Sequence, residues 1–123
     1  PWDDAKVFHY TVEDGHVTAV TMSGTFQNAT TTWVDTPDSY VPQVVVALAW
    51  GREEASFWSW SRQAQMRELE EADWERGFTL HQPGVVITAE VEQTGFYYYA
   101  GIGWQPMEEE NRLSFTYTVA LDN

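Results

Sequence analysis

Hydrophobic and polar residues alternate along most of this chain, with the period of two that is typical of β-strands with one buried face. The pattern is clearest in the C-terminal third, over residues 85–91, 96–104 and 113–121. In the last of these segments, the apolar side chains from Leu113 to Leu121 share one face, and serine, threonine and alanine occupy the other. Each segment therefore predicts a half-buried strand.

A tight hairpin is predicted near the N-terminus, where two alternating segments flank the sequence Glu-Asp-Gly-His at 13–16. Asp-Gly at the centre of such a loop favours a type I′ turn, in which both central residues have positive φ angles. This turn places Val12 opposite Val17 and Tyr10 opposite Ala19.

The middle of the chain is less regular. Residues 43–50 are almost continuously apolar, which is typical of a central strand covered on both faces. Residues 55–66 are ambiguous, although a period of two places Trp58 and Trp60 on one face and favours a strand. Residues 67–75 combine helix-forming and acidic residues, so we expect one short helix there.

The elements together indicate an all-β domain with about eight or nine strands and at most one short helix, near 67–75. An antiparallel β-sandwich of jelly-roll type is the favoured architecture, with a closed barrel as the alternative. The length of 123 residues predicts a single domain, 1–123. The expected strands are 6–12, 17–26, 30–35, 43–50, 55–66, 85–91, 96–104 and 113–121.

The charge of the chain restricts its environment and its partners. Its 19 acidic and six basic residues give a formal net charge of −13, and Lys6 is the only lysine. Nucleic acid is excluded as a partner because its binding requires Lys and Arg against the phosphates. Acidic, lysine-poor composition is typical of salt-loving organisms, since molar salt shortens the Debye length to about 3 Å. An acidic protein from a GC-rich genome is the alternative, because 13 Val accompany only two Ile.

No apolar run approaches the roughly 20 residues of a membrane helix. We therefore expect no membrane insertion. The start Pro-Trp-Asp-Asp shows no signal peptide, and Pro1 is also compatible with a processed terminus. Cysteine is absent, so neither disulfides nor thiolate metal sites contribute.

Catalytic motifs are missing from the sequence. It contains no G-x-S-x-G, P-loop or G-x-G-x-x-G motif, and its three histidines include no H-x-H pair. We expect no catalytic residues, no enzyme activity and no cofactor. Calcium is the one metal that the acidic residues suggest, held by loop carboxylates of Glu108, Glu109 and Glu110 or of Asp3 and Asp4.

The aromatic residues, 15% of the chain, are the best indication of function. Tyr97 and Tyr99 alternate with Tyr98, so this strand has large amphipathic rings on both faces. Trp58 and Trp60 form a second such pair. We therefore expect the binding residues to be Tyr97, Tyr99, Trp58 and Trp60.

Three functional hypotheses follow, in order of preference. The first is a non-enzymatic structural module of a virion, tail or cell surface that assembles as a homo- or hetero-oligomer through protein–protein contacts. The second is a carbohydrate-binding module in which the same Tyr and Trp residues stack on a glycan. The third is a small enzyme or ligand-binding barrel whose interior is lined by Glu53, Glu90 or Glu92. The first hypothesis implies a soluble protein in an extracellular, cell-surface or virion location.

Overall fold

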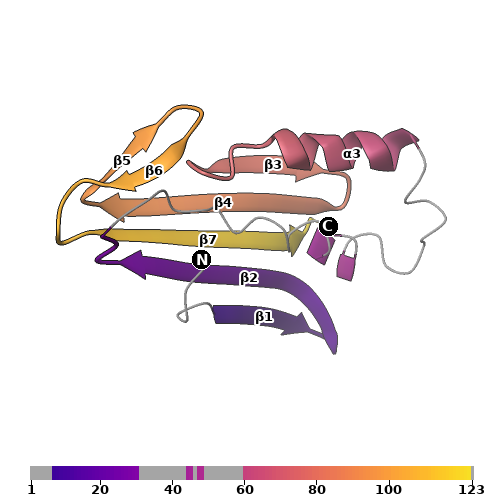
Figure 1. The fold of residues 1–123 in the computed structure, drawn as a ribbon. Coiled ribbons are helices and arrows are strands. Elements are labelled where there is room, and N and C mark those ends of the chain that lie inside the picture. The colour runs from indigo at the N-terminus through magenta and orange to yellow at the C-terminus, as the bar shows by residue number, and fades with distance from the viewer. Residues whose placement is uncertain (1–6, 31–43, 46, 49–59, 123) are drawn as a thin grey trace.

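The computed structural model describes residues 7–30, 44–45, 47–48 and 60–122 (Figure 1). These residues form seven β-strands and one α-helix, which confirms the expected all-β, sandwich-like class. In chain order, the elements are β1 (Val7–Glu13), β2 (His16–Gln27), α3 (Trp60–Glu71), β3 (Phe78–Gln82), β4 (Val85–Thr94), β5 (Phe96–Tyr99), β6 (Gly103–Pro106) and β7 (Arg112–Leu121).

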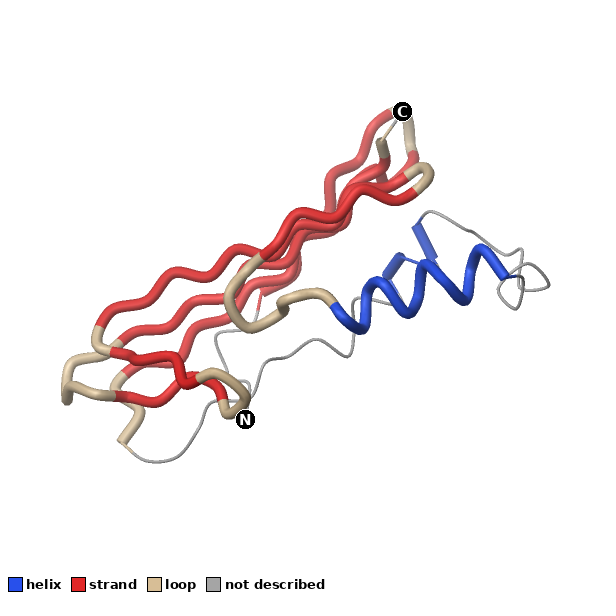
Figure 2. The backbone as a smooth tube through the Cα atoms, turned by 90° about the horizontal axis from the view of Figure 1, so that it is seen from above, coloured by secondary structure: helices blue, strands red, loops and turns tan. Residues whose placement is uncertain are grey.

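Two antiparallel sheets account for these strands. The larger sheet has the order β1-β2-β7-β4-β3, so the C-terminal strand is central and β1 and β3 form the edges (Figure 1). The smaller sheet is the hairpin β5-β6, which lies between β4 and β7 in sequence. Helix α3 lies on one side of the five-stranded sheet (Figure 2).

The predicted N-terminal hairpin is present. Asp14 and Gly15 have φ angles of 51° and 79°, as a type I′ turn requires. Val12 pairs with Val17 as predicted, but the prediction for Tyr10 is wrong, because it pairs with Val20. The register shifts by one residue between Thr11 and Val12, and such a bulge is not visible in an alternating sequence.

The core lies on the face of the large sheet that α3 covers. Central strand β7 contributes fully buried Leu113, Phe115 and Val119, and α3 contributes fully buried Leu69. Burial of these large apolar side chains is the main source of stability for such a sheet. Val45, outside the regular strands, is also fully buried in this core.

The opposite face of the large sheet is mainly polar, and no helix or strand that the structure describes packs against it. Serine and threonine are frequent on it, and hydroxyl pairs cross between strands at Thr21–Thr118 and at Thr25–Ser114, 3.3 and 3.2 Å apart. Glu90 is exposed on this face, in agreement with the prediction that the polar side of 85–91 meets water.

The middle of the chain differs from the sequence prediction. Of the predicted strand 43–50, the described residues 44, 45, 47 and 48 are helical rather than extended. The part of the predicted strand 55–66 that is described, from Trp60 onward, belongs to α3. The helix therefore starts earlier than the predicted 67–75. The predicted strand 30–35 lies outside the described residues apart from its first position.

The predicted strand 96–104 is wrong as a single element, because the chain reverses inside it. Residues 100–102 form the turn from β5 to β6, and the positive φ angles of Gly101 and Gly103, 81° and 122°, accompany this reversal. Consequently β5 pairs with β6, and not with the preceding strand β4. Strand β3 was not predicted.

Candidate interaction surfaces

The exposed large apolar side chains of the described residues gather in two hairpins. The N-terminal hairpin, β1 and β2, holds five of them, and the C-terminal hairpin, β5 and β6 with the residue that follows, holds four. Isolated exposed apolar residues are ordinary, but a grouping of this kind marks an interaction surface. The nine residues are Val7, Phe8, Tyr10, Val12, Val17, Tyr97, Tyr99, Ile102 and Met107.

Strand β1 exposes apolar side chains although one of its faces continues the core. Phe8 pairs with Met22 and Tyr10 pairs with Val20, and both partners are buried in the core. Directly opposite residues in a sheet point to the same face, so Phe8 and Tyr10 lie on the core face. They are nevertheless 41% and 64% exposed. The covering layer therefore leaves the β1 side of the sheet open.

An open apolar pocket of about 430 Å³ lies along this uncovered part of the sheet. Its described lining is apolar except for the hydroxyl of Tyr10, and it contains no acidic residue. The volume is within the range of small-molecule sites, roughly 300–1,000 Å³. The lining residues are Phe8, Tyr10, Val17, Val20, Val44, Ala47 and Leu48.

The C-terminal hairpin presents two tyrosines to solvent. Along β5, Phe96 and Tyr98 point inward, whereas Tyr97 and Tyr99 are 55% and 37% exposed. The rings of Tyr97 and Tyr99 lie 4.6 Å apart at their centroids and are inclined by 62°. They form one exposed aromatic cluster, but they are not coplanar.

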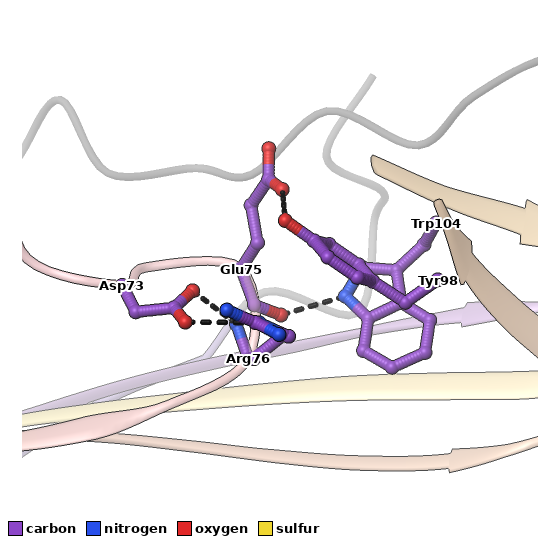
Figure 3. A network of polar contacts seen from close by, with 5 residues as sticks. All are labelled: Asp73, Glu75, Arg76, Tyr98 and Trp104. Carbon is purple, nitrogen blue, oxygen red and sulfur yellow. Dashed lines mark hydrogen bonds and ion pairs between the residues drawn. The ribbon is translucent and has the colours of Figure 1, made fainter. Parts of the chain in front are cut away.

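The inward side of this hairpin is fastened to the turn between α3 and β3 (Figure 3). The Tyr98 hydroxyl donates a 2.6 Å hydrogen bond to Oε2 of Glu75, and Nε1–H of Trp104 donates to the backbone oxygen of Glu75 at 2.6 Å. The guanidinium of Arg76 lies 4.9 Å from the centre of the Tyr98 ring, and an ion pair with Asp73 at 2.9 Å orients it. These contacts fix which side of β5 faces solvent.

Tyr98 titrates abnormally in this network. Its pKa is raised above the ordinary value of 10.0, first because its hydroxyl donates to the Glu75 carboxylate and second because of burial. A tyrosinate beside Glu75 would lose the hydrogen bond and face a like charge. Tyr98 thus acts as a neutral donor that positions the hairpin.

The structure places only part of the predicted binding set. Tyr97 and Tyr99 lie together on one exposed surface, whereas Trp58 is outside the described residues. Trp60 is the first residue of α3, so it is helical and not part of the predicted strand. The sequence interpretation missed Phe8 and Tyr10, although the alternation of β1 already contained them.

The acidic residues show no assembled site in the described part of the chain. Glu108, Glu109 and Glu110 are exposed, and no group of three or more His, Asp or Glu that could hold a metal ion is found among the described residues. Asp3, Asp4 and Glu53 lie outside those residues. Glu90 and Glu92 point to solvent rather than into the apolar pocket.

Comparison with protein-family models, with curated proteins and with solved structures finds no match to this chain. Among the described residues, no helix is long and apolar enough to cross a membrane, and α3 has only 12 residues.

Proposed function

We propose that this protein is a non-enzymatic structural module that assembles through protein–protein contacts, as a component of a virion, a tail or a cell surface. One observation carries the proposal: in a chain with net charge −13, the exposed large apolar side chains of the described residues lie in two hairpins. Aromatic residues on such surfaces supply contact energy, while the acidic remainder limits non-specific association.

The C-terminal hairpin supports this function by its construction. The contacts of Tyr98 and Trp104 with Glu75 hold one side of the hairpin against the domain. The backbone that carries Tyr97 and Tyr99 is thereby ordered before binding, which lowers the entropy cost of binding. A preorganised aromatic cluster is an economical contact for a partner protein.

The first test is the molar mass of the protein by light scattering after size exclusion, in dilute buffer and in molar salt. We expect a discrete oligomer that persists or grows with salt, because screening reduces repulsion between acidic copies. Tyr97→Ala and Tyr99→Ala should weaken assembly while the melting point of the monomer stays nearly constant. Thr79→Ala, a truncation at an exposed position of β3 outside both hairpins, is the control that should keep assembly. A monomer at every salt concentration would contradict the proposal.

A glycan-binding function receives less support from the same tyrosines. Flat sugar rings stack best on a coplanar row of exposed aromatic side chains, and Tyr97 and Tyr99 are inclined by 62°. A polysaccharide binding screen separates the two functions, since Tyr97→Ala would abolish glycan binding to a protein that stays monomeric.

The apolar pocket beside β1 favours a second candidate function, the binding of a neutral apolar ligand. Its volume of about 430 Å³ and its apolar lining suit such a ligand, whereas the acidic surface disfavours an anionic one. Saturable binding of the neutral dye Nile red to the monomer, lost in Val20→Trp, would support this candidate. Unsaturable binding would exclude it.

A high-salt habitat is part of the proposal, because it would make the charge of −13 tolerable. We expect the melting temperature of the monomer to rise between dilute buffer and molar salt. An unchanged melting temperature would favour the alternative of an acidic protein from a GC-rich genome.

A further inference from the structure

We infer that β1 is a self-complementary edge, through which two copies of this chain join their five-stranded sheets into one continuous sheet. The inference deepens the proposed assembly function and rests on it, because it names the surface and the partner. Its basis is the direction of the backbone polar groups of β1, the face on which its apolar side chains lie, and the position of its charges.

The backbone direction follows from the neighbouring strand. At the end of the β2–β7 ladder, the N–H of Asn28 donates to the carbonyl of Asn111 at 3.0 Å. Because the register from β2 to β7 is regular, even-numbered residues of β2 direct their backbone groups to β7. Odd-numbered residues such as Thr21 therefore direct theirs to β1, where Thr21 pairs with His9. In β1, His9 therefore directs its N–H and C=O to β2. Tyr10 follows His9 in the sequence, so its N–H and C=O point the other way, out from the edge of the sheet.

The same alternation applies to Phe8 and Val12. In these three residues, which we call the edge strip, the backbone donors and acceptors point away from β2, and no described residue pairs with this edge. Natural sheets protect such an edge with lysine, proline, a short strand or a covering element. Strand β1 is seven residues long and contains neither lysine nor proline. Figure 1 shows it at the free edge beside β2.

One register satisfies two copies simultaneously. In an antiparallel pair related by a two-fold axis at Tyr10, each Tyr10 lies opposite its counterpart, and Phe8 lies opposite Val12 of the other copy. All outward N–H and C=O groups of the edge strip then find partners in the narrow hydrogen-bonded geometry. The side chains of the edge strip meet on one face, so the exposed apolar surface of both copies becomes continuous and partly buried.

The charges agree with this partner. Within β1 the only acidic residue is Glu13, at its last position, so the centre of the interface carries no repelling pair. In the two-fold register, Glu13 lies opposite Val7 of the other copy, so no two acidic residues of β1 face each other. The identical copy thus offers apolar and backbone complementarity without a like-charge pair inside β1.

Cross-linking tests the register directly, because the natural chain contains no cysteine. Hydrogen-bonded antiparallel partners have Cα atoms about 5.5 Å apart, which a disulfide can span. We expect Tyr10→Cys to form a covalent dimer of twice the 14.1 kDa chain mass under mild oxidation in molar salt. The matched control is Thr11→Cys, whose counterpart is His9 in this register, and it should cross-link far less. Equal cross-linking of both variants would overturn the inference.

Two further variants test the interface without a covalent bond. Tyr10→Lys places a charge at the two-fold axis and should raise the dimer dissociation constant by roughly a hundredfold, as expected for a desolvated unpaired charge. Thr11→Lys makes the same change in net charge on the opposite face and should leave the dissociation constant almost unchanged. Tyr10→Pro removes the outward N–H together with the tyrosine ring but keeps the β1–β2 hydrogen bonds, and it should also dissociate the dimer while the melting point of the monomer is retained.

Sedimentation of these variants separates the two proposals. An oligomer that loses subunits in Tyr10→Lys and Tyr10→Pro but not in Thr11→Lys supports the β1 edge. An oligomer that none of the Tyr10 variants affects, but that Tyr97→Ala dissociates, would overturn this inference and leave the assembly function standing. A wild-type monomer at every salt concentration would overturn both.

Discussion

Asn111 provides a sharp test of how the end of the sheet is held together. This side chain is only 4% exposed. Its amide nitrogen donates to the carbonyl of Ala29 at 2.9 Å and to that of Glu108 at 2.7 Å, and its amide oxygen accepts from the N–H of Ala29 at 2.9 Å. One side chain thus joins the loop that follows β2 to the loop that precedes β7.

Asn111→Ala removes these three hydrogen bonds, so the backbone groups of Ala29 and Glu108 lose the side-chain partner that they have in the wild type. At about 1 kcal/mol for each bond, and somewhat more for a buried group without a partner, we expect a loss of about 3 kcal/mol. The free energy of unfolding of such a domain is about 5–15 kcal/mol, so the loss is a large fraction. For this chain length, it corresponds to a fall of about 10 °C in melting temperature.

Asn111→Asp refines the test because it keeps the size of the side chain and the acceptor for Ala29. It replaces the donating nitrogen by a carboxylate oxygen, which cannot donate to the two carbonyl oxygens that it faces. We therefore expect the free energy of unfolding at neutral pH to fall at least as far as in Asn111→Ala. The matched control is Asn28→Asp, which changes the charge equally at an exposed position whose positive φ suits either residue. Thermal and urea unfolding followed by circular dichroism measure all variants. Melting temperatures of both Asn111 variants within about 2 °C of the control would refute the reasoning.

Three other predictions concern the same domain. Because the raised pKa of Tyr98 keeps it protonated in the folded state, its stabilising contribution is complete below pH 10.0 and is lost as pH rises through the folded pKa. Alkaline unfolding should therefore be less steep in Tyr98→Phe than in the wild type, and identical pH profiles would contradict the role of the Glu75 hydrogen bond. Gly95→Ala should destabilise the protein far more than Gly84→Ala: both have positive φ, but only at Gly95 would a Cβ lie 2.6 Å from a backbone oxygen. Equal melting temperatures of the two glycine variants would contradict this packing. Leu69→Ala should cost about 2–5 kcal/mol in urea unfolding, because this fully buried residue fastens α3 to the sheet; a loss below about 1 kcal/mol would show that the helix is not part of the core.

The sequence was sufficient for the class of the fold and for the strands with one buried face. Alternation in 113–121 and in 85–91 is a local signal, and both segments form strands that extend the prediction by only a few residues. The apolar segment 43–50 could not be assigned in this way. Its described residues are helical. A continuously apolar sequence suits a buried helical turn as well as a central strand, so the pattern alone does not distinguish the two.

The candidate surfaces were predictable only in part, for a related reason. Exposure of Tyr97 and Tyr99 followed from alternation with Tyr98. The partner that fixes Tyr98, Glu75, is 23 positions away, and a contact at that separation has no signature in a single sequence. The uncovered state of β1 was equally inaccessible, because the alternation of Phe8 and Tyr10 shows which face they share but not whether a layer covers it.

The two edges of the large sheet show why β1, and not β3, is the edge suited to assembly. Strand β3 has five residues, and its last residue, Gln82, donates from its side chain to the backbone oxygen of Gln65 in α3 at 2.8 Å. The helix thus lies close to that edge and hinders a second chain from pairing there. Strand β1 is longer and no described strand pairs with its outer edge, so the net charge of −13 is the protection against association that the described residues and the sequence show. Protection of that kind depends on ionic strength, whereas protection by a helix does not. Salt should therefore control the association of this protein through β1 while leaving the β3 edge closed.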